Sequence, residues 1–327
     1  MSKNWQVLLG LVVVLALITA ACGGSEGSAN EELGEGGDEE GAGGEGGELS
    51  GSIEVDGSST VAPLTDAIAE EYAVEQSNVT VNVGVSGTGG GFERFCAGET
   101  DISDASRPIK DEEAEICADA GVEYVELRVG TDALTMVTTP ETDWVDCLTT
   151  EEVTKIFGEE DAATTWSEVN PEFPDEPLEV FAPGTDSGTY DFMVEDVLGL
   201  EGSRQDFNAS EDDNIIAQGV IGTPGSWGFF GFAYFQESAD QLKALEYDAG
   251  DGCVAPSVES AQDDSYQMTR PLFIYVQQEA LERPEVEGFV TYYLDTVPSL
   301  IDEVGYIGVP DEDLEAAKSD LQEAIDG

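Results

Sequence analysis

The chain has 327 residues, and its 71 Asp and Glu outnumber 11 Lys and Arg to give a formal net charge of −60 at pH 7. Because an acidic surface repels the phosphodiester backbone, this charge excludes nucleic acid as a partner, and it is typical of proteins that stay soluble in molar salt. The sequence contains no histidine, which excludes Ser-His-Asp and Cys-His catalysis and His-ligated metal sites.

The N-terminus has the pattern of an export signal. After a weakly basic start, an apolar run extends from Val7 to Ile18, and small residues then precede Cys22. The run is too short for a membrane span of about 20 residues, so we predict a signal peptide over 1–21. Cys22 is similar to the cysteine of a bacterial lipobox, although Thr19 stands where Leu is commonest. We expect lipid on Cys22 to anchor the mature protein to the outer face of the cytoplasmic membrane; an ordinary signal peptide with an incidental cysteine is the alternative.

Residues 22–50 are predicted to form a lipid-anchored, flexible tether. Glycine and acidic residues dominate this segment, which has no Lys or Arg and few apolar side chains. Such a chain cannot bury enough apolar surface to offset the entropy lost on ordering, and its like charges extend it. We therefore expect a spacer between the lipid and a folded part that begins near Gly51.

Three strand–turn–helix junctions in the folded part are rich in small hydroxyl residues. In chain order the strands are Ile53 to Val55, Val79 to Val85 and Leu178 to Phe181, and the turns are Gly57 to Pro63, Ser86 to Gly91 and Gly184 to Thr189. A turn that opens a helix presents free backbone N–H groups and hydroxyls, which together with the helix dipole make an anion site. Taken alone, the Asp186-Ser187-Gly188-Thr189 turn is as often a simple helix cap.

Together, the three turns predict a site for one compact oxyanion held by neutral donors. None has Lys after its last glycine, so none is a P-loop, and Ser86 to Gly91 lacks the acidic ribose partner of a dinucleotide site. We do not expect an enzyme. Asp186-Ser187-Gly188 is similar to an aspartic-protease loop, but that mechanism needs a second such loop, and neither this nor a Ser-x-x-Lys motif is present.

Five runs of the sequence occur in an order that is typical of one family. They are Asp56 to Pro63, Ser86 to Phe92, Gly98 to Ile109, Pro183 to Phe192 and Thr269 to Tyr275. Together they resemble the phosphate-binding protein of the high-affinity phosphate ABC transporter. The resemblance implies an α/β, bilobal periplasmic-binding-protein type II fold, in which two α/β lobes are joined by two crossover strands. It also implies a solute-binding lipoprotein that delivers inorganic phosphate to permease subunits with a cytoplasmic ATPase. We expect a monomer with no cofactor and no metal.

The resemblance also implies a division of the chain into lobes. The first lobe is expected to consist of about 51–133 plus 275–327, and the second of about 137–270, with the crossover strands as the hinge. Late helical patterns lie at Val286 to Leu294 and at Leu314 to Ile325. Because both patterns follow the return crossover, we expect these helices to pack on the first lobe.

By the same resemblance, phosphate is expected in the cleft between the lobes. The expected contacts are Ser59, Thr60, Thr88, Gly89, Ser106, Arg107, Ser187, Gly188 and Thr189. The neutral donors disperse the charge of the dianion, and Arg107 supplies one bidentate, charge-assisted pair. The chain departs from the family at Pro183, where many members carry Arg, so we expect the cation from the first lobe. Asp104 and Asp186 are candidates for accepting the phosphate proton, and Asp186 is also a candidate for orienting Arg107.

Two other functions remain open. A site carboxylate accepts a hydrogen bond from HPO4²⁻ but repels fully ionised sulfate, so a binding protein for sulfate or molybdate is the nearer rival. A non-transport adhesion or signalling lipoprotein is the third possibility, but it would leave the three donor turns unexplained.

Four cysteines remain after Cys22, and four cysteines allow three pairings. Because disulfides persist outside the cytoplasm, we favour Cys96–Cys117, which brackets the expected phosphate loop of the first lobe, and Cys147–Cys253 within the second lobe. A zinc site built from all four thiolates is the alternative, although no C-x-x-C spacing is present.

Overall fold

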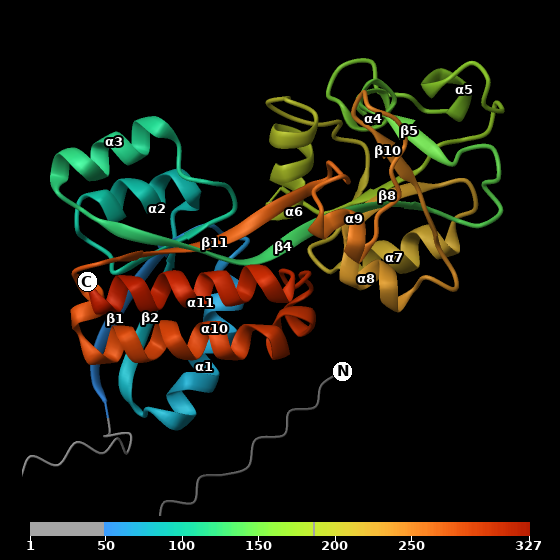
Figure 1. The fold of residues 1–327 in the computed structure, drawn as a ribbon. Helices are drawn as coiled ribbons and strands as arrows, with labels where there is room; N and C mark the ends of the chain where they lie inside the picture. The colour runs from blue at the N-terminus through green and yellow to red at the C-terminus, as the bar shows by residue number, and fades with distance from the viewer. Residues whose placement is uncertain (1–48, 186) are drawn as a thin grey trace, which may run out of the picture. The chain divides into compact units, whose positions relative to one another are not determined.

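The computed structural model describes residues 49–185 and 187–327, which form a mixed α/β fold (Figure 1). The predicted signal peptide over 1–21, the lipidation site Cys22 and nearly all of the tether over 22–50 lie outside the described residues, as does Asp186. In the part of the chain that the structure describes, no helix combines the length and the apolarity needed to cross a membrane.

The described elements alternate between strands and helices. In chain order they are β1 (Ser50–Gly57), α1 (Ala62–Glu75), β2 (Asn78–Val85), α2 (Gly87–Cys96), β3 (Ile102–Ala105), α3 (Asp111–Ala120), β4 (Tyr124–Thr138), β5 (Cys147–Thr149), α4 (Thr150–Phe157), α5 (Trp166–Val169), β6 (Val180–Ala182), α6 (Gly188–Asp191), the π-helix η1 (Phe192–Val197), β7 (Asn208–Ala209), α7 (Asp213–Gly222), β8 (Trp227–Gly231), α8 (Phe232–Glu237), β9 (Lys243–Ala244), β10 (Glu246–Asp248), α9 (Val258–Gln262), β11 (Thr269–Gln277), the 3-10 helix η2 (Ala280–Glu282), α10 (Pro284–Val304) and α11 (Asp311–Asp326).

A nine-stranded sheet connects two groups of elements: the first surrounds β1, β2 and β3, and the second surrounds β6, β7 and β8. Its order is β2-β1-β3-β11-β4-β8-β6-β7, with β9 also paired to β4. The outer pairs are parallel, and the pairs of β11 with β3, of β11 with β4 and of β4 with β8 are antiparallel. β4 pairs with β11 from Tyr124 to Ala133 and with β8 from Leu134 to Val137. β4 and β11 therefore cross from one group to the other (Figure 1).

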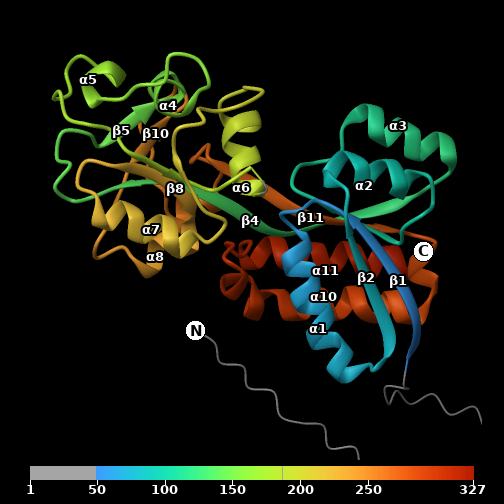
Figure 2. The same cartoon turned by 180° about the vertical axis from the view of Figure 1, so that it is seen from behind.

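Two hydrophobic cores correspond to these groups. The larger one takes its buried residues from 53–129 and 272–321, and the second takes them from 134–268. In the first group, α1, α10 and α11 cover one face of the sheet, and α2 and α3 lie on the other (Figure 2). The predicted apolar face of α10 belongs to the first core, as does that of α11. This confirms that both late helices pack on the first group, and the two-lobed α/β architecture is confirmed as well.

The helix predicted after the Gly184 to Thr189 turn differs from an ordinary α-helix. Tyr190, Met193 and Val194 on its apolar face are buried, whereas Val197 and Leu198 are only partly buried. However, α6 is short and continues into η1, and the Leu198 N–H donates to the carbonyl of Met193, five residues earlier. Such a bond defines a π-turn, which the spacing of apolar residues does not distinguish from an α-turn.

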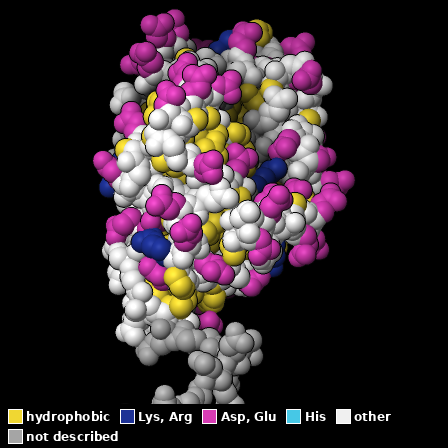
Figure 3. Space-filling model, turned by 60° about the vertical axis from the view of Figure 1, so that its left-hand side comes forward, with side chains coloured by type: hydrophobic (Ala, Val, Ile, Leu, Met, Phe, Trp, Pro, Cys, Tyr) yellow, Lys and Arg dark blue, Asp and Glu magenta, His cyan; other side chains and the backbone are white. Residues whose placement is uncertain are grey.

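Both favoured disulfide pairings are confirmed. Cys96–Cys117 joins α2 to α3, and Cys147–Cys253 joins β5 to the loop after β10. No thiolate among these four is left for the zinc alternative. The surface seen in Figure 3 carries many Asp and Glu side chains and few Lys and Arg, as the net charge requires.

Candidate functional site

A cavity of 620 Å³ lies where the loops that follow β1, β2 and β3 meet α6 and the start of β11. β1 is parallel to both β2 and β3, so their carboxyl ends lie at the same edge of the sheet, where α/β proteins bind ligands. Six of the nine predicted contacts line the cavity, namely Ser59, Thr60, Thr88, Ser106, Arg107 and Gly188. Gly89, Ser187 and Thr189 lie beside these residues in the chain but do not form the wall.

Hydrogen bonds to backbone and side-chain groups hold the loops of the first lobe. The Thr60 N–H donates to the Ser58 hydroxyl at 3.2 Å, and the Tyr306 hydroxyl donates to the Thr60 carbonyl at 2.6 Å. The hydroxyls of Thr88 and Ser106 lie 3.1 Å apart. Because these contacts pre-set the loops, the hydroxyl donors are arranged before a ligand arrives.

The second-lobe loop lies directly against the first. The Ser187 hydroxyl caps α6 by accepting from the Thr189 N–H at 3.2 Å. A Cβ at Gly188 would lie 3.0 Å from Oγ1 of Thr60 and 3.3 Å from Oγ of Ser59. The donor turns after β1 and β6, which are far apart in the sequence, therefore meet at Gly188.

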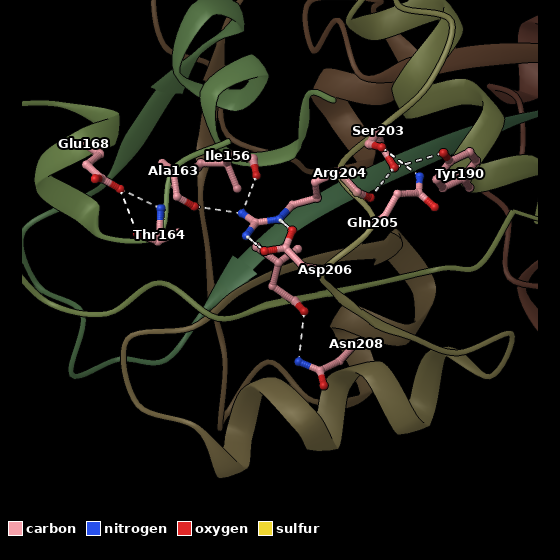
Figure 4. A network of polar contacts seen from close by, with 11 residues as sticks. Ile156, Ala163, Thr164, Glu168, Tyr190, Ser203, Arg204, Gln205, Asp206 and Asn208 are labelled. Atoms are coloured by element: carbon pink, nitrogen blue, oxygen red, sulfur yellow. Dashed lines mark hydrogen bonds and ion pairs between the residues drawn. The ribbon is translucent and has the colours of Figure 1, made fainter. Parts of the chain in front are cut away.

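A polar network holds the segment behind this second-lobe loop (Figure 4). Tyr190, at the third position of α6, shares a 2.9 Å hydrogen bond with the Ser203 hydroxyl. The next residue, Arg204, is buried and donates to the carbonyls of Ile156 at 3.0 Å and Ala163 at 2.8 Å. These bonds anchor α6 to the second core and so position Gly188.

Arg107 lines the cavity but is also paired with a carboxylate. Its Nη1 and Nη2 lie 2.8 and 2.7 Å from the two carboxylate oxygens of Glu113, and its guanidinium lies over the Phe92 ring at 5.6 Å. Burial alone would raise the pKa of the Glu113 carboxyl, but hydrogen bonds from Arg107 and from the Lys110 N–H outweigh burial and lower it. Glu113 is therefore ionised and holds the guanidinium at the edge of the cavity.

The structure does not bring the Asp104 carboxylate to the cavity. Asp104 is fully buried and accepts a 3.0 Å hydrogen bond from Thr65 on α1, whose hydroxyl also contacts Tyr293 on α10. Its Oδ2 has no hydrogen-bond partner among the described residues. Burial raises the pKa of Asp104 to about 8. The side chain thus belongs to the core between β3 and the helices, while Asp186, the other predicted carboxylate, is not described.

Several cavity residues escaped the sequence analysis. Arg270 at the start of β11 is 8% exposed and lines the cavity, as do Lys110 and the acidic residues Asp191, Glu195 and Asp196. Burial raises the pKa of Asp191, an effect that Arg270 opposes. In the sequence, the run from Thr269 to Tyr275 indicates only a crossover strand. The available signal is a single arginine in a largely apolar strand of a chain that has few basic residues.

Comparisons with known proteins agree with this architecture. Residues 42–296 match the family model of the PBP superfamily domain. Protein SphX of Synechococcus elongatus is 48% identical over 79% of this chain and 77% of its own length. The phosphate-binding protein PstS of Staphylococcus saprophyticus is 34% identical over 99% of this chain and 96% of its own length. A crystal structure from Planctomyces limnophilus, described as that of a possible phosphate binding protein, is 41% identical, with a TM-score of 0.81, and covers 85% of this chain and 99% of its own.

The family model spans well over half of the chain, and the PstS relative matches almost from end to end. The fold, with two α/β groups joined by crossover strands, is that of a bilobal binding protein. The chain therefore belongs to the PBP superfamily and, within it, to the family of the phosphate-binding protein PstS.

Proposed function

We propose that this protein captures inorganic phosphate in the 620 Å³ cavity and delivers it to the permease of a phosphate ABC transporter. One observation carries the proposal: donor loops from both groups of elements meet at a single cavity. Two guanidinium groups line the same cavity. Backbone N–H groups, hydroxyls and arginines are the donors that bind a compact oxyanion. The names of the PstS relatives support phosphate as that oxyanion.

The proposed ligand contacts remain those expected from the sequence, with Arg107 as a charged donor. Ser59, Thr60, Thr88, Gly89, Ser106, Ser187, Gly188 and Thr189 are proposed as the neutral ones. The carboxylates of Asp191, Glu195 and Asp196 on the cavity wall support phosphate over sulfate. A carboxylate can accept the proton of HPO4²⁻, whereas it repels a fully ionised dianion. Asp186 stays a candidate for this acceptor.

The two cores are proposed to be two lobes that close on the ligand. Their buried residues support boundaries near those expected, with 51–133 plus 275–327 in the first lobe and 137–270 in the second. β4 and β11 are then the hinge, because they alone among the described strands pair across the boundary between the groups. Closure around a ligand is a common motion of bilobal binding proteins.

We also propose that the protein is exported and held at the outer face of the cytoplasmic membrane through lipid on Cys22. The apolar run, the small residues before Cys22 and the acidic, Gly-rich segment over 22–50 support this. Mass spectrometry of the membrane-bound protein should find a lipidated N-terminal Cys22. Cys22→Ala should release the protein from the membrane, and retention of this variant would contradict the anchor.

Equilibrium dialysis against radiolabelled phosphate in about 1 M salt tests the proposed function, since added salt screens the acidic surface. Bound label should be displaced by unlabelled phosphate and not by equal concentrations of sulfate or molybdate. Displacement by sulfate would favour a protein for another oxyanion. Absence of bound label would favour a non-transport lipoprotein.

A further inference from the structure

Arg270 combines burial with access to the cavity. It is the second residue of β11, one of the two strands that cross between the groups of elements, and only 8% of it is exposed. It lines the same cavity as Arg107. Burying a guanidinium is costly unless the charge is paired and its donors are used, so this position needs a compensating arrangement.

Asp132 provides that compensation from the other crossover strand. Arg270 and Asp132 are directly opposite in the antiparallel register of β11 and β4. Nε and Nη2 of Arg270 each lie 2.9 Å from Oδ2 of Asp132, which is itself buried. A charge-assisted contact of this kind fixes the plane of the guanidinium and hence the direction of its other donors.

The same guanidinium also touches the second-lobe donor loop. Nη2 donates to the carbonyl of Gly188 at 3.0 Å, and the Phe192 ring lies 4.7 Å from the guanidinium carbon. Arg270 is thus in contact with β4, with α6 and with η1. Within residues 49–185 and 187–327, Nη1 makes no hydrogen bond or ion pair, so this end of the fork has no partner among the described residues.

Arg107 differs in this respect. Both of its terminal nitrogens donate to Glu113, and Nη1 also donates to the carbonyl of Pro108 at 3.0 Å. Its side chain is 30% exposed, whereas that of Arg270 is 9% exposed. Interactions with a charged ligand strengthen as water is excluded. A hydrogen bond from Arg270 to the ligand would therefore contribute more to the free energy of binding than an equal bond from Arg107.

We propose that Arg270 is a second ligand-binding arginine, which donates to the bound oxyanion through Nη1, and that Asp132 is the positioning residue that aims it. This inference rests on the proposed phosphate function. An anion held in this way is linked through one side chain to both crossover strands and to the Gly188 loop. Arg270 therefore also supplies the cation that Pro183 does not.

Phosphate affinity of Arg270 variants tests the inference, with inorganic phosphate as the probe and the exported protein in about 1 M salt. Arg270→Gln should weaken phosphate binding by more than about tenfold, because a buried charged donor to a dianion is lost. The matched control is Arg128→Gln, which removes an arginine from the same pair of strands. Arg128 contacts Thr131 and Asp264 and is not part of the cavity wall, so affinity should change by less than about threefold.

A second variant keeps the test valid if Arg270→Gln does not fold. Arg270→Lys retains the charge and the buried stem but cannot serve Asp132, Gly188 and the ligand together, so it should weaken phosphate binding by about fivefold or more. The ³¹P resonance of bound phosphate should also shift in Arg270→Lys and stay unchanged in Arg128→Gln, which a purely structural arginine would not produce.

The outcomes separate this inference from the function on which it rests. Wild-type protein that binds no phosphate would overturn both. A second outcome is that the wild type binds phosphate but a variant loses too little affinity. A loss of less than about tenfold in a folded Arg270→Gln, or of less than about fivefold in Arg270→Lys, would overturn the role of Arg270 alone. If Asp132 acts through Arg270, Asp132→Asn should weaken binding in the wild type but change it by less than about twofold in the Arg270→Gln background; equal losses in both backgrounds would overturn the positioning role.

Discussion

The backbone of Gly188 lies so close to Thr60 that a methyl group at Gly188 would come within 3.0 Å of the Thr60 hydroxyl oxygen. The two residues belong to donor loops of different lobes. An added methyl group would force the Thr60 side chain to move by a few tenths of an ångström, so glycine at this position favours the close approach of the two loops.

Gly188→Ala is therefore expected to weaken phosphate binding. Overpacking costs about 1–3 kcal/mol. If this cost destabilises only the closed, ligand-bound form, it lowers the affinity roughly 5- to 150-fold. Gly222→Ala is the matched control, because no atom lies within 4 Å of the added Cβ at the end of α7. Calorimetry of both variants checks this prediction. Equal affinities for the two would contradict the proposed closure at Gly188.

Arg107→Ala should reduce phosphate affinity by about 2–5 kcal/mol, because a bound dianion loses a charged donor. The melting temperature of the ligand-free protein should change little, since a partly exposed ion pair such as Arg107–Glu113 contributes only about 0–1 kcal/mol. Lys318→Ala removes the same charge from a pair with Asp295 that lies away from the cavity. If Arg107→Ala bound phosphate as tightly as Lys318→Ala, Arg107 would not be a ligand contact.

Asp104 should make the stability of the protein depend on pH. Burial raises the pKa of its carboxyl to about 8, compared with about 3.9 in an unfolded chain. Between these values the folded state keeps a proton that the unfolded state releases. The contribution of Asp104 to the free energy of unfolding is therefore full below about pH 4 and declines as pH rises toward 8.

Asp104→Asn isolates this effect because the amide has the same shape and cannot ionise. Urea unfolding of both proteins at several pH values should show the variant gaining stability relative to wild type as pH rises from about 4 to 8. The comparison cancels the repulsion among the many surface acids, which affects both proteins equally. A stability difference that did not vary with pH would show that Asp104 is ionised in the folded protein.

The two disulfides should differ in their contribution to stability. Cys147–Cys253 spans 106 residues and Cys96–Cys117 spans 21. In the chain-entropy model these loops correspond to about 5 and about 3 kcal/mol. Replacing Cys147 and Cys253 together by Ala should lower the free energy of unfolding more than replacing the other pair. Denaturant titration of the two double variants checks the order, and the reverse order would contradict it.

Local features of the chain were readable in advance because they depend on neighbours in the sequence. The donor turns, the apolar face of α10 and the likeness of five short runs to one family all belong to this class. The position of Arg270 does not, because it depends on the register that places it opposite Asp132 in another strand. Asp104 is a similar case. All four residues of β3 are buried, so both faces of this strand are covered by protein. The order of polar and apolar residues in the strand therefore does not indicate which face the Asp104 side chain takes.

Calorimetric titration of the purified protein with phosphate and then with sulfate, in about 1 M salt, tests the central claim most directly. The account predicts one phosphate per chain, bound with a dissociation constant at or below about 1 μM, a binding free energy of about −8 kcal/mol. Sulfate should bind far more weakly, because carboxylates on the cavity wall repel it without receiving a proton. Equal affinities for the two anions, or no heat with phosphate, would contradict the account.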